Sequence, residues 1–453
     1  QIDHALGGND DDQLLDIDFS SLVRLTDADG DFVDATGGFV ISIEDDFPIN
    51  QQAGLVNVSV HEDALNNAQS VGNGEGADPG QTTSRAITAA ALADTVSVGA
   101  DEPVIFTLNT LAADADASAD DESIDGEVVL DTAGNPVTSG GSAVVYKVDG
   151  GEIQGIVVGG NDDGSDRVVF TLTADIDADG GFVVTLVDQI DHPTASSDAA
   201  GDRETLGLNL SGAFIATDAD GDYVVLDSAV TVQIEDDIPI NQQAGLVDVT
   251  VHEDALNNAQ SVGNGESPAQ TVSHAITAAV LATTVSVGAD EPVTFTLNTL
   301  AADADESVAD ESIDGEVVLD TAGNPVTSGG PLNAVVYKVV EGEIQGVVVG
   351  DGVNGSDRVV FTLTADADGG FVVTLVDQID HPTASSDVAG DRETLGLNLS
   401  GAFIATDADG DYVVLDSAVT VQIEDDTPVV NEGVSVTGLV HEDALVGGNA
   451  EVG

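Results

Sequence analysis

The chain contains no cysteine, methionine or tryptophan, and only 8 of its 453 residues are lysine or arginine. Without cysteine, neither a disulfide framework nor a thiolate metal site can form. The few basic residues are scattered singly, which excludes a phosphate-binding patch for nucleic acid or for an anionic membrane surface. Aromatic residues make up 4% of the chain. The core must therefore consist of Val, Ile, Leu, Ala and a few Phe, a composition that favours β-sheets.

Long apolar runs are also missing. No stretch approaches about 18 apolar residues, and no charged-then-apolar signal begins the sequence. We therefore expect no membrane insertion by this segment, and we expect any export signal to lie outside it.

What the chain has in excess is negative charge. It carries 84 acidic residues and a formal net charge of −76, yet 42% of its residues are hydrophobic. A chain with so much apolar surface to bury is not a disordered acidic tail. A folded chain of this charge repels itself unless cations neutralise the carboxylates, and divalent cations are the economical choice. The alternative is the acidic surface of a protein from a salt-loving organism.

The sequence repeats itself over long distances. The segment His61–Glu75 recurs unchanged as His252–Glu266, 191 residues later, and Gly201–Asp237 recurs as Gly390–Asp426, 189 residues later. Such a period indicates a tandem array. Partial copies at both ends, QIDH at Gln1 and HEDAL at His441, indicate that the chain is cut from a longer array.

The motif IEDD-x-P, at Ile43–Pro48, Ile234–Pro239 and Ile423–Pro428, is the best boundary because proline removes a ladder donor and stiffens the junction. A phasing that begins at each QIDH is equally self-consistent. The first choice predicts the end of one repeat, two complete repeats and the start of another, over residues 1–47, 48–238, 239–427 and 428–453.

Within a repeat, apolar residues follow a period of two, as in Val293–Leu297, Val359–Thr364 and Phe371–Val376. Turn signals separate such runs at short intervals. The pattern predicts an all-β fold, with tandem antiparallel immunoglobulin- or cadherin-like β-sandwich repeats of about 190 residues in an elongated rod. Leu395–Ile404 is predicted as one strand, and Ala86–Leu92, with its counterpart, as a short helix.

The motif T-D-A-D-G-D occurs three times and carries the clearest chemistry. Alternate carboxylates around a glycine turn place hard oxygen ligands on one concave side of a loop, which suits Ca²⁺. Three acids within five residues repel one another unless an ion lies between them. The spacing is not that of an EF-hand. A polar hairpin tip is the alternative interpretation. The acids are Asp27, Asp29, Asp31, Asp218, Asp220, Asp222, Asp407, Asp409 and Asp411.

Two further acidic motifs flank each predicted junction. One ends the last strand of a repeat and the other lies about 17 residues into the next repeat, so both could share ions across the junction. The alternative is a solvated linker. The candidate ligands are Glu44, Asp45, Asp46, Glu235, Asp236, Asp237, Glu424, Asp425 and Asp426 in the first motif, and Glu62, Asp63, Glu253, Asp254, Glu442 and Asp443 in the second. Asp101-Glu102, Asp114 with Asp116, and Asp303 with Asp305 are weaker candidates.

Enzymatic chemistry is not indicated. A histidine beside acids, as in QIDH and VHED, could serve a zinc site or a general base. However, no nucleophile elbow and no phosphate-binding glycine loop occur. Every acidic group recurs with the repeat, which favours a structural role of these acids over a role in a single catalytic site.

The combination of DADGD, a strand and IEDD-x-P, with LVDQIDHP upstream and VHEDAL downstream, resembles the repeat modules of very large type I-secreted (RTX) adhesins of Gram-negative bacteria. The resemblance covers nearly the whole chain. It implies cadherin- and immunoglobulin-like sandwiches stiffened by Ca²⁺ outside the cell, with the DADGD, EDD and HED acids as ligands. The nonapeptide of RTX β-rolls occurs once, imperfectly, at Gly7–Leu15.

The expected function is therefore a calcium-stabilised extracellular stalk of a bacterial surface adhesin, acting in attachment or biofilm formation. Its partners would be neighbouring repeats of the same chain. The alternative is a self-assembling matrix fibre, in which other copies of the chain are partners too. A secreted lectin or enzyme would need one non-repeated site, and the sequence shows none.

Overall fold

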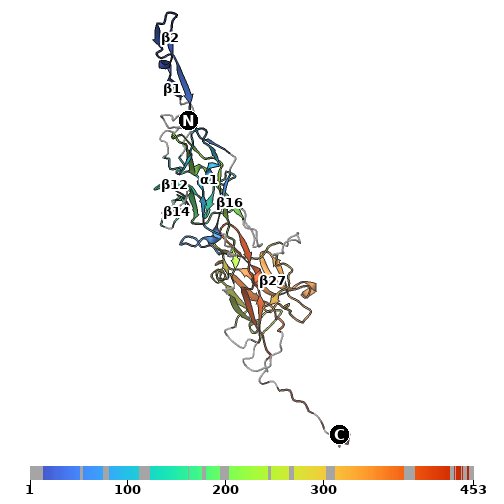
Figure 1. Cartoon of the computed structure of the whole chain (residues 1–453). Helices are drawn as coiled ribbons and strands as arrows, with labels where there is room; N and C mark the ends of the chain where they lie inside the picture. Colours follow the sequence, from blue (N-terminus) through green and yellow to red (C-terminus); the bar gives the residue numbers. More distant parts are fainter. Residues whose placement is uncertain are drawn as a thin grey trace. The chain divides into compact units, whose positions relative to one another are not determined.

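The computed structural model is built mainly from β-strands and contains few helices (Figure 1). Nearly all strand pairs are antiparallel. The all-β prediction is confirmed. The structure describes residues 14–51, 55–74, 81–111, 123–161, 163–175, 180–193, 204–242, 246–264, 270–301, 312–381 and 393–428, together with residues 433, 435–439, 441 and 446–447.

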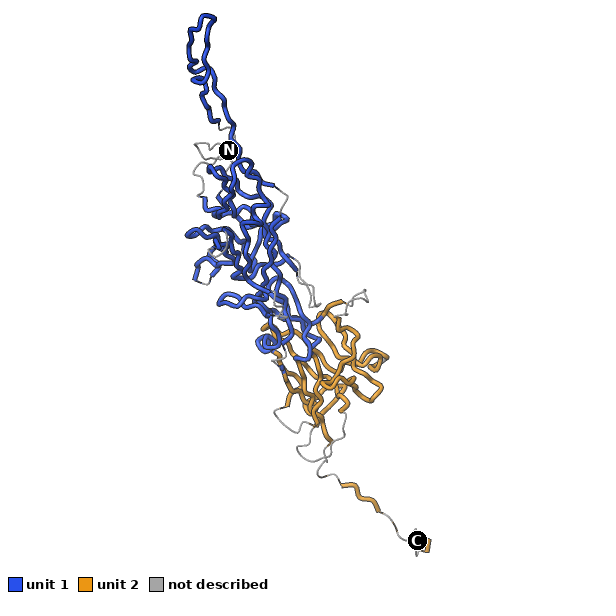
Figure 2. Tube along the Cα trace, in the orientation of Figure 1, with its two compact units in different colours: residues 1–247, 277–298, 400–418 blue, residues 248–276, 299–399, 419–453 orange. Residues whose placement is uncertain are grey.

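Two compact units can be distinguished (Figure 2). Unit 1 comprises residues 1–247, 277–298 and 400–418, and unit 2 comprises residues 248–276, 299–399 and 419–453. Unit 1 thus contains the predicted end of the preceding repeat, the first predicted complete repeat and three segments of the second one, residues 239–247, 277–298 and 400–418. The repeat boundaries themselves stay a prediction.

Unit 1 has one five-stranded sheet and several smaller ones around a shared core. The five-stranded sheet is antiparallel, and its strand β15 alternates buried and half-buried residues, as the period-two pattern predicts. In sheet order its strands are β12 (Val145–Asp149), β13 (Glu152–Val157), β14 (Arg167–Ala174), β15 (Phe182–Leu186) and β7 (Ser84–Ile87). Apolar side chains of this sheet and of two three-stranded sheets form one hydrophobic cluster.

The first three-stranded sheet contains a parallel pair. Its strands are β16 (Thr205–Asn209), β19 (Val230–Glu235) and β6 (Val56–His61). β16 is antiparallel to β19, whereas β6 is parallel to it, with Val56 opposite Val230 and His61 opposite Glu235. The second sheet is antiparallel and consists of β18 (Tyr223–Val225), β17 (Phe214–Thr217) and β9 (Ile105–Leu108).

The remaining strands of unit 1 form small sheets. The pairs are β5 (Ile49–Asn50) with β8 (Val96–Ser97), β10 (Thr138–Ser139) with β11 (Ser142–Ala143), and β20 (Ile240–Asn241) with β23 (Val285–Ser286); a further sheet joins β24 (Thr294–Leu297), β31 (Phe403–Thr406) and β32 (Tyr412–Val414).

Residues 14–44 form two paired segments with the sequence pattern of β16 to β19. β1 (Leu14–Asp18) pairs with β4 (Val40–Glu44), and β2 (Arg24–Thr26) pairs with β3 (Phe32–Asp34). Most of their apolar side chains are exposed, Phe32 to 60%. Among the described residues no third strand pairs with either segment.

Unit 2 contains a five-stranded antiparallel sheet and a four-stranded sheet. The first consists of β22 (Ser273–Ile276), β29 (Phe371–Leu375), β28 (Arg358–Ala365), β27 (Glu343–Val348) and β26 (Val336–Val340). The second consists of β21 (Val247–His252), β33 (Val419–Glu424), β30 (Thr394–Asn398) and β25 (Leu319–Asp320).

Two local predictions need correction. The stretch Leu395–Ile404 is not one strand, because a 3₁₀ turn at Ser400–Ala402 separates β30 from β31. In the equivalent turn of the first predicted repeat, Ser211–Ala213, the Ser211 hydroxyl accepts hydrogen bonds from the backbone N–H groups of Ala229 (2.8 Å) and Val230 (2.9 Å) and so interrupts the strand pairing.

The predicted helix Ala86–Leu92 begins later than expected. Strand β7 continues to Ile87, and α1 spans Ala89–Ala93. The helix begins there because the side chain of Thr88 caps it, accepting a hydrogen bond from Ala91 N at 3.2 Å. Its counterpart α2 (Ala278–Leu281) is capped by Thr277 in the same way.

Candidate metal centre

Strand register brings three acids together at one end of the three-stranded sheet β16–β19–β6 in unit 1. His61, the last residue of β6, lies opposite Glu235, the last residue of β19. The residues that follow them, Glu62 and Asp236, therefore lie side by side where the two parallel strands end. Glu204 precedes β16 and lies at the same end, where its carbonyl oxygen accepts a hydrogen bond from Asp236 N at 3.0 Å. Glu62 and Asp236 are far apart in the sequence, and they meet because the parallel strands β6 and β19 end on the same side of the sheet.

A second set of acids in unit 1 comes from the end of the β24–β31–β32 sheet. The loop 407–411 closes the β31–β32 pair, and β24 lies beside β31. Asp290 lies in the turn before β24, and its carbonyl oxygen accepts a hydrogen bond from Ala408 N at 3.0 Å. Asp411 shares a potential metal-binding group with Glu204 and Asp236. The two sets of acids thus form one group.

His192 lies in the middle of this group. Its Nδ1 is 3.2 Å from Asp236 Oδ1, 3.9 Å from Glu62 Oε2 and 3.9 Å from Asp409 Oδ2. The main chain of His192 also donates a hydrogen bond to Asp409 Oδ2 at 3.2 Å. We call the whole group the acidic cluster. It comprises Glu62, His192, Glu204, Asp236, Asp237, Asp290, Asp407, Asp409 and Asp411.

The acidic cluster is buried, and several of its oxygens have no hydrogen-bond partner. Glu62, Asp236 and Asp290 have no exposed surface. Both carboxylate oxygens of Asp290 and one oxygen each of Glu62 and Asp236 have no hydrogen-bond partner among the described residues. Within that part of the chain, no lysine or arginine pairs with these three acids. Burying carboxylates in this way is costly unless a cation or protons compensate.

The same burial raises the pKa values of these carboxyls. Desolvation, with repulsion from neighbouring acids, raises the pKa of Asp236 to about 6, that of Asp237 to about 8 and that of Asp407 to about 10. The pKa values of Glu62 and Asp290 are also raised, again chiefly by desolvation. At neutral pH the cluster therefore holds protons or attracts cations.

A glycine turn fits against Asp237. The Asp237 carboxylate accepts hydrogen bonds from Ala289 N (2.8 Å) and Asn73 N (3.0 Å). Gly288 has φ +67°, and a Cβ there would collide with the Asp237 carboxylate. The sequence G-A-D therefore allows the chain to approach Asp237 closely and positions Asp290.

A related group occurs elsewhere in unit 1. Asp45, Asp101 and Asp220 place carboxylate oxygens within 4.8 Å of one another. Asp46 accepts a hydrogen bond from Ala100 N at 2.8 Å, just as Asp237 does from Ala289. Asp101, a weak candidate in the sequence, thus lies among the predicted ligands.

The DADGD loops share one internal arrangement. In the loop beside this group, Asp218 Oδ1 accepts hydrogen bonds from Gly221 N (3.0 Å) and Asp222 N (2.9 Å), and Gly221 has φ +112°. The other oxygen of Asp218 is buried without a hydrogen-bond partner among the described residues. Burial raises the pKa of Asp218 to about 6. One oxygen thus shapes the loop and leaves the other available to a ligand.

Unit 2 repeats one part of the acidic cluster. Glu253, His381 and Asp425 can together contact one ion, and Glu253 Oε1 accepts a hydrogen bond from Ile379 N at 2.6 Å, as Glu62 does from Ile190. Burial raises the pKa of Glu253 to about 8. These residues line a cavity of about 380 Å³ in unit 2.

The other predicted ligands lie in varied settings. Asp27, Asp29 and Asp31 are close together but fully exposed. Glu235 and Glu424 lie 3.7 Å and 3.8 Å from the histidines that precede the HED acids, His61 and His252.

The second acid of the two described HED motifs lies beside another acid. Asp63 and Asp254 each accept a hydrogen bond from a glutamine side chain. Asp63 lies beside Asp237, and Asp254 lies beside Asp426, whose pKa rises to about 6 through burial and this neighbour. Glu44 is exposed in β4. Glu442 and Asp443 lie outside the described residues, as do Asp114, Asp116, Asp303 and Asp305.

Sequence reasoning considered His192, the histidine of one QIDH motif, only as an alternative zinc ligand or general base, and it missed Glu204 and Asp290 as members of the cluster. Each recurs in the second repeat or the first, as His381, Glu393 and Asp101. Recurrence at the repeat spacing was therefore a usable signal, although spacing alone could not show that these residues meet.

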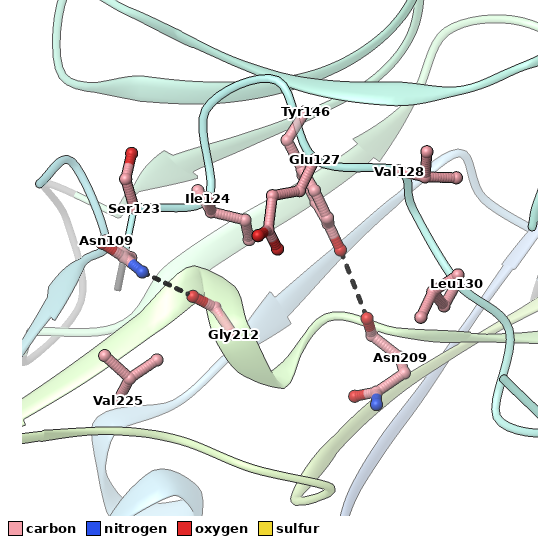
Figure 3. Close-up of a pocket in the computed structure, with 10 residues that line it drawn as sticks. All are labelled: Asn109, Ser123, Ile124, Glu127, Val128, Leu130, Tyr146, Asn209, Gly212 and Val225. Carbon is pink, nitrogen blue, oxygen red and sulfur yellow. Dashed lines mark hydrogen bonds between the residues drawn. The ribbon is translucent and has the colours of Figure 1, made fainter. Parts of the chain in front are cut away.

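A different cavity of unit 1, of about 290 Å³, is shown in Figure 3. Its lining is partly apolar, including Ile124, Val128 and Leu130. Asn109 donates a hydrogen bond to the carbonyl oxygen of Gly212 (2.9 Å), and the Tyr146 hydroxyl donates one to that of Asn209 (3.2 Å). These polar groups already have partners, so the acidic cluster is the stronger candidate site.

Fold and site together define a highly acidic all-β chain with buried carboxylates at the ends of its sheets. A comparison with models of known protein families gives no match, and a comparison with curated proteins gives none either. In the part of the chain that the structure describes, no helix is both long enough and apolar enough to cross a membrane.

Proposed function

We propose that the chain is a calcium-stabilised extracellular stalk of tandem β-sandwich repeats, belonging to a bacterial surface adhesin and lacking enzymatic activity. The observation that carries the calcium part is the acidic cluster, in which Glu62, Asp236 and Asp290 are buried with unpartnered oxygens. The adhesin part is supported by the resemblance of the DADGD and IEDD-x-P motifs to adhesin repeats.

The donor set of the cluster suits calcium. Most potential ligands are carboxylate oxygens, which Ca²⁺ binds in numbers of six to eight and in flexible geometry. The summed negative charge of these carboxylates exceeds the positive charge of one Ca²⁺ ion, so the cluster can hold more than one cation. Extracellular modules bind Ca²⁺ at about 10⁻⁴–10⁻³ M, so such a cluster would fill outside the cell.

The cluster also connects successive stretches of the sequence. Glu62 and Asp236 belong to the first predicted complete repeat, whereas Asp290 and Asp409 belong to the second. An ion held by acids from both stretches would tie the end of one repeat to the start of the next. This coupling is the structural role that the proposal gives to calcium.

The calcium proposal is tested by melting the chain in Ca²⁺ and in EDTA at matched ionic strength, with NaCl and Mg²⁺ as controls. Ions that bind only the folded state raise the melting temperature by mass action. We expect Ca²⁺ to raise it by many degrees beyond both controls. Equal melting temperatures in Ca²⁺ and EDTA would contradict the proposal, and dependence on NaCl alone would favour the acidic surface of a salt-loving organism.

The stalk proposal is distinguished from a matrix fibre by negative-stain images of the chain in Ca²⁺. Separate particles are expected for a stalk. Laterally bundled filaments would instead support the fibre.

A further inference from the structure

His192 makes the acidic cluster chemically different from an all-oxygen calcium site. The imidazole is buried, with 5% of the residue exposed, and it lies among carboxylates. Calcium takes oxygen ligands, whereas imidazole nitrogen is a preferred ligand of Zn²⁺ and its neighbours in the transition series.

The ring orientation leaves one nitrogen facing the carboxylates. Nε2 of His192 lies 3.3 Å from the carbonyl oxygen of Ile234, to which it can only donate a hydrogen bond. In the neutral ring Nδ1 is then an unprotonated lone pair. Nδ1 has no hydrogen-bond partner among the described residues, and neither does Glu62 Oε2, 3.9 Å away.

Groups that can only accept hydrogen bonds repel one another, and they do not converge on one point unless a cation lies between them. The separations of Nδ1 from Asp236 Oδ1 (3.2 Å) and from Glu62 Oε2 (3.9 Å) resemble the edge of a tetrahedron around Zn²⁺, about 3.3 Å for bonds of about 2.0–2.1 Å. The hydrogen bond from Nε2 to a backbone carbonyl is the contact that usually orients a metal-bound histidine.

We infer that His192 Nδ1, Glu62 and Asp236 bind a divalent transition-metal ion of the Zn²⁺ class, with Asp409 as a possible fourth ligand. The site shares Glu62 and Asp236 with the acids that support calcium binding, and it differs from an all-oxygen calcium position by its imidazole ligand. The inference rests on the proposed function only in that both place cations in the same cluster.

Unit 2 provides an internal comparison. Glu253, His381 and Asp425 repeat the three ligand types, but only Glu253 is a buried residue there, whereas Glu62, His192 and Asp236 are all buried. His381 Nε2 lies 3.9 Å from Glu253 Oε1. A more open group binds an ion less tightly. We therefore expect two classes of histidine-containing site, the tighter one at His192.

The first test follows the imidazoles of the full calcium-loaded chain by ¹H–¹⁵N NMR while Zn²⁺ is added. The chain has seven histidines. We expect the ring of His192 to shift first and that of His381 to shift at higher Zn²⁺, whereas added Ca²⁺ produces no Nδ1 ligation shift. Imidazole rings that do not respond to Zn²⁺ would overturn the inference, because His192 would then be a packed or protonated side chain.

The second test compares His192→Asn with His61→Asn by calorimetric Zn²⁺ titration in excess Ca²⁺. His61 is a matched control, since its Nδ1 accepts a hydrogen bond from Thr82 N at 3.2 Å and, among the described acids, its Nε2 forms an ion-pair contact with Glu235 only (3.7 Å). Loss of an outer-shell partner typically costs 10–100-fold in metal affinity, so loss of the ligand itself should cost about 100-fold or more. His61→Asn should leave Zn²⁺ binding unchanged.

The two proposals fail separately. If Ca²⁺ raises the melting temperature but Zn²⁺ leaves His192 unshifted, the transition-metal site is wrong and the calcium proposal stands. If Zn²⁺ shifts His192 but Ca²⁺ does not stabilise the chain, the reverse holds. Equal Zn²⁺ affinity of His192→Asn and the wild type also overturns the site. Should His192→Asn fail to fold, the NMR titration of the wild-type chain decides.

Discussion

The same aspartate of the DADGD motif occurs in three surroundings. Asp29 is exposed, Asp220 is half-buried, and the side chain of Asp409 is buried within 3.9 Å of His192 Nδ1. The motif alone therefore does not decide whether a carboxylate is a ligand. Its surroundings decide, because only a buried carboxylate needs a compensating charge.

This difference predicts opposite effects of one substitution. Asp409→Asn should raise the melting temperature in EDTA, because it removes a buried repulsive charge, and should lower it by several degrees in Ca²⁺, because it removes a ligand. About 1 kcal/mol corresponds to about 2–4 °C in units of 150–250 residues. Calorimetry in EDTA and in Ca²⁺ measures the direction of the change in melting temperature in each buffer. Asp29→Asn, at the same motif position, should change neither value, and a matching effect at Asp29 would contradict the role of burial.

Close packing of the glycine turn predicts a second difference. Gly288→Ala should destabilise the chain by more than Gly315→Ala, which shares a positive φ (+90°) but has open space around its Cβ position. The strained backbone costs about 1–3 kcal/mol at either site, and only Gly288→Ala adds a collision with Asp237. Urea unfolding in Ca²⁺ measures the difference. Equal losses would show that Asp237 does not hold this turn.

At this scale the sequence predicted ligands within a motif but not their partners. Three acids in five residues are recognisable wherever they occur, and Asp218, Asp236 and Asp409 were predicted in this way. Asp290 and His192 each have only one acidic neighbour, Glu291 and Asp191, so the local sequence marks them weakly. Their role depends on which strand ends share an edge, and that is a property of topology.

Strands were more predictable than their interruptions. The alternating pattern of Phe371–Val376 predicted β29 to within one residue, because every second side chain must face the core. The 3₁₀ turns were not predicted. A serine within an apolar run resembles any half-exposed strand residue, until its hydroxyl is seen to bond the backbone of a neighbouring strand.

Two elements of matching sequence pattern differ in their partners. β19 pairs with both β16 and β6, and Val232 has no exposed surface, whereas β4 pairs with β1 alone among the described residues and Ile41 is 44% exposed. Amides of β4 should therefore exchange with solvent faster than those of β19, since local opening costs less where few apolar contacts are lost. Hydrogen exchange with mass spectrometry compares the two peptides, and equal protection would contradict the expectation.

Over the whole molecule, the raised pKa values predict how stability depends on pH. Asp236, Asp237 and Asp407, with pKa values of about 6, 8 and 10, bind protons more tightly when folded than their ordinary value of 3.8 allows when unfolded. Their contribution to the stability of the metal-free chain is therefore fully present below about pH 3.8 and is lost as the pH rises through these values.

In EDTA the melting temperature should therefore be higher at pH 6 than at pH 8. In Ca²⁺ the order should reverse, because protons compete with the ion for the same oxygens. Carboxyls with lowered pKa values, such as that of Asp131, stay ionised throughout this window and do not obscure the effect. Calorimetry at both pH values, with Asp237→Asn as a variant that removes part of the slope, measures it. A flat profile in EDTA would show that the cluster carries no charge penalty.

The parallel pairing of β6 with β19 has a mechanical consequence. Val56, where the chain enters β6, and Glu235, where it leaves β19, lie at opposite ends of the pair. Tension applied to residues 56 and 235 would slide the two strands past each other and load every hydrogen bond between them at once. A hairpin pulled at its open end instead loses its bonds one at a time. If the chain acts as the proposed stalk, this pair of strands would resist tension in shear.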